Sequence, residues 1–241
     1  MSVFGAVLDL LFPPKCPFCR RGVDGAAVCE ACEKSLPWTK GGEGLFTGAD
    51  GLCCSAPLFY EGAVRDALLR LKFHGADHLA QPLGELLARC AAERLSGEFD
   101  AVTWVPVGPK RLKKRGYDQA RLLAESACRL WKIPPERLLV KIGDNPAQSG
   151  LADAAARRAN VLGMYEIAPA ARVAGRRILL IDDICTTGST LTECVRTLRS
   201  GGAEQVVCAA VARTCPERDA QRAGEDKLEN FSTLQNVLAI R

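Results

Sequence analysis

The sequence is poor in histidine, in aromatic residues and in long hydrophobic runs. Its two histidines, His74 and His78, lie four residues apart, with Gly75 between them and no third ligand in view. We therefore expect surface or hinge residues rather than a metal pair or a general base. The one strongly basic run, at 110–115, is followed by Tyr117 but is not interleaved with aromatic residues, which gives little support to base stacking.

No hydrophobic run approaches the length of a transmembrane helix. The first residues have apolar side chains at helical spacing, but the stretch lacks a basic segment and a small-residue cleavage site, and Asp9 interrupts it: MSVFGAVLDLLFPPKC. We expect a cytoplasmic protein without membrane insertion, beginning with a short amphipathic helix.

The charge balance is mildly basic, with a formal net charge of +4 and a pI near 8.5. Such a balance permits a phosphorylated ligand or nucleic acid as partner and requires neither. With 48% hydrophobic and 25% charged residues, the 241-residue chain can bury a substantial core.

Twelve cysteines are present, and four of them form two C-x-x-C pairs: Cys16, Cys19, Cys29 and Cys32. Two such pairs can bind one tetrahedral structural Zn²⁺, although a redox or unligated role is the alternative. The adjacent Cys53 and Cys54 would chelate one ion poorly, so a second zinc site is doubtful. Most of the remaining cysteines fit core positions, whereas Cys185 lies in a polar loop where a thiolate would be favoured.

The order of segments predicts an α/β fold with a parallel sheet. Residues up to about 52 are rich in Cys, Gly and Pro, and residues 64–95 have leucines at helical spacing with a break at Gly75. Further on, we expect strands at DAVTWVPVG, RLLVKI and VLGMYEI, separated by a helical pattern and a polar loop. The last two runs, RRILLID and QVVCAAVAR, are continuously apolar like buried parallel strands, and the order of these segments implies one parallel sheet. The polar segment 143–160 is a candidate lid.

The stretch RRILLIDDICTTGSTL joins a buried strand to two carboxylates and a loop of small hydroxyl residues. Ligands of open α/β sheets bind at the carboxyl ends of strands. Backbone N–H groups near Gly188, with the neighbouring hydroxyls, suit a phosphate, whereas Asp182 and Asp183 suit sugar hydroxyls. The pattern indicates a ligand with a phosphate at one end and a ribose beside it; a structural turn with two solvated aspartates is the alternative.

The motif ILLIDDICTTGST resembles the 5-phosphoribosyl-1-pyrophosphate signature of type I phosphoribosyltransferases. More of the chain resembles the ComF (ComF/GntX) family of competence-associated proteins, through six motifs in the family's order. They are LFPPKCPFC, CEAC, LKFHG, VPVGPKRLKKRGYDQARLLA, AQSGLADAAARRANVLGMYEI and the Asp-Asp loop.

The resemblance implies an N-terminal zinc-ribbon domain at 1–52 and a type I phosphoribosyltransferase-like domain at 53–241. The second domain would have a helical hood at 60–95, a core at 100–215 and a peripheral tail at 216–241. Asp182 and Asp183 would meet the ribose hydroxyls, and pyrophosphate would leave with Mg²⁺. The resemblance further assigns the 5-phosphate to Thr186, Thr187, Gly188, Ser189 and Thr190, and the pyrophosphate to Pro106, Val107, Gly108 and Pro109.

Five basic residues follow the predicted pyrophosphate loop: Lys110, Arg111, Lys113, Lys114 and Arg115. They could bind pyrophosphate, contact nucleic-acid phosphates or form a solvated face. The family's link with DNA uptake favours single-stranded DNA as a partner, together with competence proteins.

Two departures from the family pattern bear on activity. Asp118 stands where relatives generally carry Asn, and Lys141-Ile142-Gly143 lacks the usual Arg. A carboxylate facing the site would repel pyrophosphate. The sequence therefore favours a protein that binds 5-phosphoribosyl-1-pyrophosphate and acts in DNA uptake, and the alternative is an active phosphoribosyltransferase with an unidentified acceptor.

Overall fold

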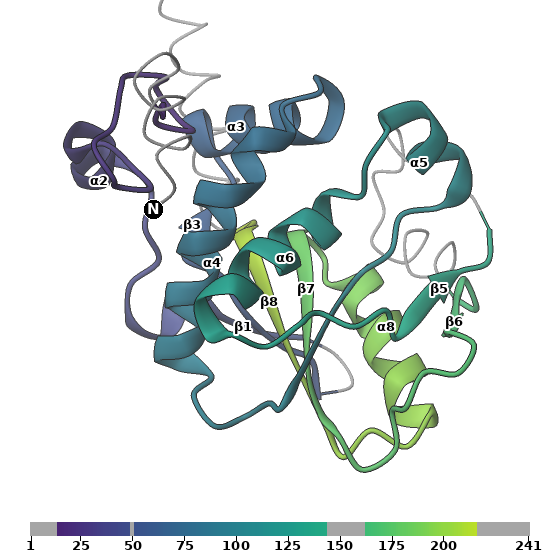
Figure 1. Ribbon diagram of the computed structural model, residues 1–241. Coiled ribbons are helices and arrows are strands. Elements are labelled where there is room, and N and C mark those ends of the chain that lie inside the picture. Colours follow the sequence, from purple (N-terminus) through teal and green to yellow (C-terminus); the bar gives the residue numbers. More distant parts are fainter. Residues whose placement is uncertain (1–13, 49–50, 144–161, 216–241) are drawn as a thin grey trace, which may run out of the picture.

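The computed structural model describes residues 14–48, 51–143 and 162–215 (Figure 1). The predicted N-terminal helix, residues 144–160 of the predicted lid and the predicted tail at 216–241 lie outside these ranges. Among the described helices, none combines the length and the apolar character that crossing a bilayer requires.

A six-stranded sheet forms the centre of the molecule, with strand order β1-β2-β8-β7-β4 and β3 also pairing with β8. All its pairings are parallel except β1 with β2. The strands are β1 (Leu45–Thr47), β2 (Cys53–Ser55), β3 (Leu58–Phe59), β4 (Ala101–Trp104), β7 (Arg177–Cys185) and β8 (Gln205–Arg213).

The two long central strands are buried on both faces, as their continuous apolar sequences predict. Successive side chains of a strand point to opposite faces, so β7 contributes to two cores. Leu179 and Ile181 pack into one core, whereas Ile178 and Leu180 pack into the other.

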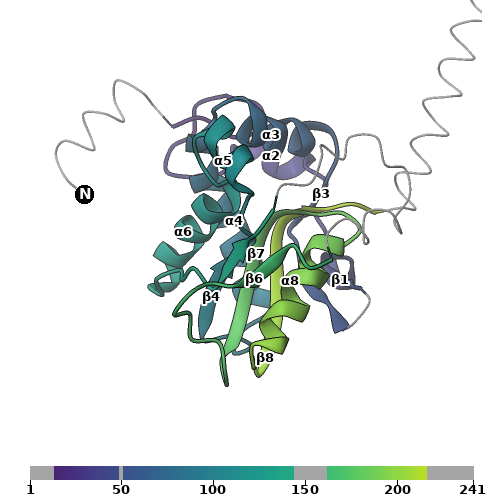
Figure 2. The same cartoon turned by 90° about the vertical axis from the view of Figure 1, so that its right-hand side faces the viewer.

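Helices cover both faces of this sheet (Figure 2). Helices α4 (Ala80–Arg94) and α6 (Gln119–Trp131) pack together on one face, and α8 (Ser189–Ser200) covers the other. The crossing of α4 and α6 is close, because a Cβ at Gly84 would lie 2.5 Å from the Ser126 Cβ. A side chain at this glycine would force the two helices apart.

The predicted break at Gly75 is confirmed: α3 (Gly62–Phe73) ends just before it, and Gly75 has a left-handed φ of +64°. The chain then continues through the short helix η3 (Asp77–Leu79) into α4. In Figure 1, α3 lies beyond the carboxyl ends of β7 and β8, opposite α5 (Pro109–Arg115), while α4 runs along the sheet. The overhanging part of the predicted hood is therefore α3.

The cysteine-rich segment packs against this hood rather than standing apart from it. It contains α2 (Glu30–Ser35) and is followed by η1 (Gly41–Gly44). Phe18, Val28 and Leu36 share one hydrophobic core with the buried leucines of α3 and α4. Arg94, at the end of α4, donates hydrogen bonds to the Thr39 hydroxyl and carbonyl oxygens, which joins the following loop to the same layer.

One expectation about the sheet is wrong. The strand-like runs RLLVKI and VLGMYEI do not join the parallel sheet but form a separate antiparallel pair, β5 (Leu139–Lys141) with β6 (Tyr165–Ile167). Each has three residues, and α8 packs against β6. Their sequences resemble the buried strands because a short apolar run does not encode its partner.

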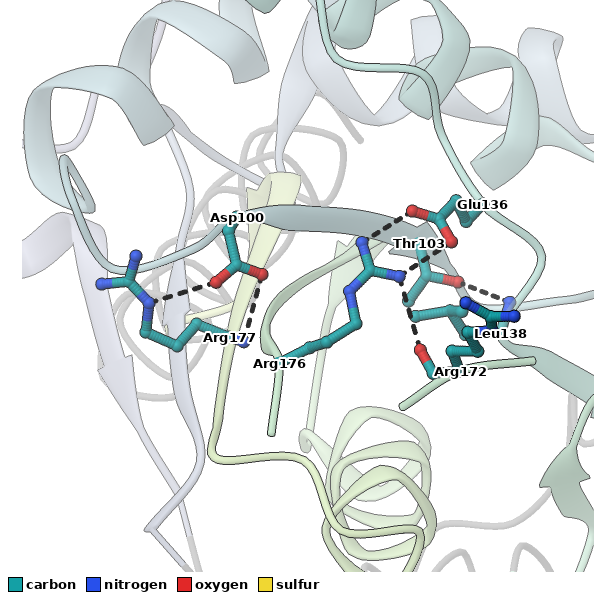
Figure 3. A network of polar contacts seen from close by, with 7 residues as sticks. All are labelled: Asp100, Thr103, Glu136, Leu138, Arg172, Arg176 and Arg177. Carbon is teal, nitrogen blue, oxygen red and sulfur yellow. Dashed lines mark hydrogen bonds and ion pairs between the residues drawn. The ribbon is translucent and has the colours of Figure 1, made fainter. Parts of the chain in front are cut away.

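The amino-terminal edge of the sheet is held by two ion pairs between residues distant in sequence (Figure 3). Arg177 Nε lies 3.3 Å from Asp100 Oδ2, and Arg176 makes two bonds of 2.7 and 2.8 Å to the Glu136 carboxylate. These contacts join the starts of β4, β5 and β7. The candidate site lies at the opposite edge, at the carboxyl ends of the parallel strands.

Candidate functional site

Two adjacent carboxylates lie near the carboxyl end of β7. Asp182 and Asp183 are 9% and 3% exposed, and β7 continues beyond them to Cys185. The Asp183 backbone N–H donates to Asp182 Oδ1 at 2.8 Å. Burial, together with the neighbouring Asp183 charge, raises the pKa of Asp182 well above its usual range. The alternative of two solvated aspartates is excluded by this burial.

A lysine from the hood reaches these carboxylates. Lys72 Nζ, near the end of α3, lies 2.8 Å from Asp183 Oδ2. Among the described residues, Oδ2 has this ion-pair partner and no hydrogen bond. Burial opposes the lysine charge, but the Asp183 carboxylate outweighs it and raises the pKa of Lys72. The pair is therefore charged, buried and incompletely hydrogen-bonded, which suits an exchangeable contact.

Further contacts hold α3 against the opposite side of the site. The Tyr117 hydroxyl donates to the Leu71 carbonyl oxygen, and the Arg115 guanidinium lies 5.4 Å from the centre of the Phe73 ring. Burial lowers the pKa of Arg115, and the nearby Asp183 partly offsets this. Arg115 and Lys72 thus present positive charge to the carboxylates from two different helices.

The loop after β7 turns into α8 at a glycine. Gly188 has a left-handed φ of +73° and precedes the first residue of α8. A Cβ there would lie 2.8 Å from Leu52 Cδ2 and 2.9 Å from Phe46 Cε1, so both conformation and space require glycine. The Thr187 and Ser189 hydroxyls are 2.8 Å apart. The loop therefore presents hydroxyls and helix-start N–H groups together.

The predicted pyrophosphate loop, Pro106–Pro109, lies between β4 and α5, on the strand next to β7. Asp118 holds it in place, because its Oδ2 accepts from the Val107 N–H at 3.1 Å while its Oδ1 caps α6 through the Arg121 N–H. Burial raises the pKa of Asp118, opposed by these hydrogen bonds. The carboxylate expected to repel pyrophosphate is thus engaged by the backbone and fixes the loop.

The structure divides the basic run. Lys110, Arg111, Lys113 and Lys114 are exposed along α5. Arg115 is half-buried, donates to the Gln119 side-chain oxygen and lies near enough to Asp183 for the carboxylate to raise its pKa against the effect of burial. The first four can meet a partner outside the molecule, and Arg115 belongs to the site.

The four cysteines of the two C-x-x-C pairs come together. Their Sγ atoms all lie within 4.8 Å of one another, with Cys19 and Cys29 sulfurs 3.4 Å apart. Thiolates in a tetrahedral zinc centre lie roughly 3.8 Å apart, given Zn–S bonds of about 2.3 Å. Four sulfurs at this spacing fit one structural Zn²⁺, with no position left open for substrate.

Other cysteines do not extend this centre. Cys53 and Cys54 are consecutive strand residues that pack into different hydrophobic cores on opposite sheet faces, so they cannot chelate one ion together. Cys185 is 1% exposed, and a hydrogen bond from the Cys54 thiol lowers its pKa. It faces the core, not the ligand loop.

Lys72 is the residue that sequence reasoning missed. It sits in the quoted motif LKFHG, directly after the buried Leu71 and four residues after the buried Leu68. That spacing puts Lys72 at the border of the buried face of α3, which is a detectable signal. The sequence alone could not show that this border faces Asp183.

Comparison with protein families matches two parts of the chain. Residues 7–42 match a double zinc ribbon domain, and residues 140–237 match a phosphoribosyl transferase domain. The chain is 28% identical to the DNA utilization protein YhgH of Escherichia coli over 77% of its length and 78% of that protein. It is 29% identical to competence protein ComFC of Streptococcus pneumoniae, covering 82% and 80%.

The chain belongs to the ComF family. Competence protein F of Haemophilus influenzae is another relative, 36% identical over 47% of this chain and half of that protein. Among solved structures, a glutamine phosphoribosylpyrophosphate amidotransferase from B. subtilis covers 54% of the chain and 25% of its own, at 26% identity and a TM-score of 0.37. Together with the parallel sheet, the two family matches show that this ComF-family chain combines a zinc ribbon with a type I phosphoribosyltransferase-like fold.

Proposed function

We propose that this ComF-family protein binds 5-phosphoribosyl-1-pyrophosphate at the carboxyl edge of its sheet and acts in DNA uptake, on single-stranded DNA. The observation that carries the first part is the pair of buried carboxylates, Asp182 and Asp183, five residues before a glycine loop that opens a helix. A buried pair of acids is unfavourable without a partner, and ribose hydroxyls supply hydrogen bonds that fit it.

Each end of the ligand has a matching element. The 5-phosphate suits the 186–190 loop, where the Thr187 and Ser189 hydroxyls lie at the start of α8. The pyrophosphate suits the 106–109 loop, which Asp118 holds in place beside the site. The two loops follow neighbouring parallel strands, so they face each other across the carboxylates.

Lys72 supplies the charge balance of this site. In the ligand-free protein its ammonium neutralises Asp183. When ribose hydroxyls bind to the carboxylates, Lys72 and Arg115 provide positive charge toward the diphosphate, which carries more negative charge than the ribose. Transfer in such a site would depend chiefly on this positioning and charge stabilisation.

A divalent cation also fits the donor set. Asp183 Oδ2 is buried, and its partner among the described residues is the Lys72 ammonium at 2.8 Å. Carboxylate oxygen is the ligand that Mg²⁺ prefers, and Mg²⁺ would replace Lys72 at this atom when Lys72 turns to the diphosphate. Mg²⁺ bound with the diphosphate would neutralise the charge that develops on the leaving group. Asp182 and Asp183 are the residues that would hold it, directly or through water.

The role in DNA uptake is supported by relatives named competence protein F, ComFC and DNA utilization protein. The exposed α5 residues 110, 111, 113 and 114 provide positive charge for a phosphate backbone. Their replacement by alanine should weaken binding to single-stranded DNA and reduce its salt dependence. An unchanged salt slope would remove α5 from the DNA interface.

The second candidate function is an active phosphoribosyltransferase. On sequence grounds the carboxylate of Asp118 was expected to oppose turnover, but it accepts hydrogen bonds from the Val107 and Arg121 N–H groups and stabilises the loop instead. Release of pyrophosphate in a screen of acceptors would establish transfer. Tight binding with no release across nucleobases, amines and amides would favour the binding role.

Calorimetric titration of the zinc-loaded protein with 5-phosphoribosyl-1-pyrophosphate and Mg²⁺ tests the site. Thr187→Ala should weaken binding about tenfold or more, the effect of losing a hydrogen bond to a charged group. Asp183→Asn should weaken it as well, whereas Asp100→Asn, which alters an ion-paired carboxylate at the opposite edge of the sheet, should not. Absence of saturable binding to the wild-type protein would refute the proposal.

A further inference from the structure

A cavity of about 480 Å³ lies between the zinc ribbon and the hood, apart from the phosphoribose site. Its buried apolar lining comes from Cys16, Ala76 and Leu79. Its remaining lining residues are all basic or imidazole side chains: Lys15, Arg20, Arg70, His74 and His78. The volume falls within the range of small-ligand pockets and accommodates a nucleotide-sized group.

The cations of this cavity are not neutralised within it. Lys15, Arg20 and Arg70 form no ion pair with any carboxylate in the described ranges. Burial lowers the pKa of Arg70, the adjacent Arg20 lowers it further, and Asp66 partly offsets both. Two guanidinium groups that line one cavity create a positive potential that an anion would relieve.

Hydrogen bonds to the first cysteine turn hold the backbone of Arg20 and the guanidinium of Arg70. Arg20 has a left-handed φ of +65°, a conformation that glycine adopts at no cost, and its N–H donates to the Cys16 carbonyl oxygen in the first cysteine turn. Arg70 donates from one guanidinium nitrogen to the Pro17 carbonyl oxygen. That bond fixes the guanidinium and leaves its other N–H groups available, since arginine carries five donors.

The position of Arg70 also connects the cavity with the phosphoribose site. Arg70 and Lys72 are two residues apart on α3, so they project from different sides of the helix. Lys72 reaches Asp183, whereas Arg70 reaches the ribbon. The last turn of α3 therefore provides one cation, Lys72, to the phosphoribose site and another, Arg70, to the cavity.

We propose that the cavity between ribbon and hood is a second phosphate-binding site, in which Arg20 and Arg70 clamp a phosphate group and Lys15 adds charge at the rim. Guanidinium pairs match phosphate oxygens in charge and in fork geometry. The phosphate belongs either to a nucleic-acid strand or to a small diphosphate. This site is separate from the phosphoribose site and from the exposed residues of α5.

The test compares two double variants that remove the same charge. Arg20→Gly/Arg70→Gln alters the cavity, and Arg129→Gln/Lys132→Gly alters the exposed end of α6. Lys132 also has a left-handed φ, of +57°, so both variants place glycine where glycine is tolerated. Zinc content and thermal unfolding are measured for both. Lys15→Gln is a third variant that leaves the Arg70–Pro17 anchor intact and covers the case in which the first does not fold.

Two probes distinguish the source of the phosphate. Fluorescence anisotropy with labelled dT20 measures strand binding. Calorimetry with inorganic pyrophosphate measures small-diphosphate binding in an Asp118→Ala background, in which the 106–109 loop loses its hydrogen bond from Val107. We expect the cavity variant to lose at least tenfold in affinity for one probe while the α6 variant does not. For the strand, the slope of log K against log salt should fall by about 1.4, for two lost contacts.

A selective loss with dT20 assigns the site to strands, and a selective loss with pyrophosphate assigns it to small diphosphates. Equal affinities of the two double variants and the Lys15→Gln protein for both probes, including no binding at all, would overturn the proposal. Asp183→Asn should leave phosphate binding in the cavity unchanged. This variant therefore distinguishes a failure of the cavity proposal from a failure of the proposed phosphoribose site.

Discussion

Replacing Lys72 with methionine keeps the length of the side chain but removes the ammonium group that faces Asp183. The lysine side chain is 26% exposed and the aspartate side chain 5%, with 2.8 Å between their charged atoms. Asp182 lies next in sequence and is also buried, so the variant leaves two buried acids without this cation.

Removing one partner of a buried ion pair costs roughly 3–5 kcal/mol. Because a quarter of the lysine side chain is exposed, we expect a loss near the lower end, about 3 kcal/mol. For a protein of this size, each 1 kcal/mol lowers Tm by about 2–4 °C, so Tm should fall by about 6–12 °C. Lys34→Met is the matched control, because Lys34 pairs with Glu30 at 2.5 Å with both side chains more than 70% exposed. It should lower Tm by no more than about 2 °C.

Thermal unfolding of Lys72→Met, Asp183→Asn and the double variant, followed by circular dichroism, forms a double-mutant cycle. The double variant should recover much of the stability lost in Lys72→Met, because the uncompensated charge is then absent. A Lys72→Met protein as stable as the Lys34→Met control would refute the reasoning. Strictly additive losses would show that the two groups do not interact.

Three further outcomes follow from the same contacts. The folded protein raises the pKa of Asp182, so the stability that this group contributes is complete below about pH 4 and is lost as pH rises through the folded pKa. Asp182→Asn should therefore raise Tm at pH 8 and flatten the dependence of Tm on pH, which calorimetry across pH 4–8 measures. Asp118→Ala should lower the free energy of unfolding by about 1 kcal/mol through loss of the α6 cap. It should also weaken binding of the diphosphate more than binding of ribose 5-phosphate, and an equal loss of affinity for both ligands would contradict a role in holding Val107. Chelation of zinc should unfold the ribbon, seen as faster proteolysis before residue 45 and a lower Tm, whereas unchanged cleavage would show that metal does not hold it.

Much of the fold could be read from local patterns. Continuous apolar runs predicted the buried strands β7 and β8, leucine spacing predicted α3 and α4, and Gly75 marked the break between them. These features depend on periodicity and backbone sterics, which act over a few residues. The pairing of β5 with β6 did not follow, because two short apolar runs look alike whether they join a large sheet or form their own pair.

The candidate site divides in the same way. The order of Asp182, Asp183 and the 186–190 loop was enough to predict a phosphate and a ribose, because strand, turn and helix start are contiguous. The hydrogen bond between Asp118 and Val107 did not follow from the sequence, since it spans eleven residues and depends on how α6 meets the loop.

The sequence by itself determined the zinc-binding set, the buried parallel strands and the contiguous carboxylate–hydroxyl loop, because each consists of residue types at short, fixed spacing. Only the tertiary structure decided that Lys72 from the hood neutralises Asp183, 111 residues away, and that Arg20 and Arg70 line one cavity. Contacts between distant segments depend on helix direction and layer packing, which the local pattern of side chains does not specify.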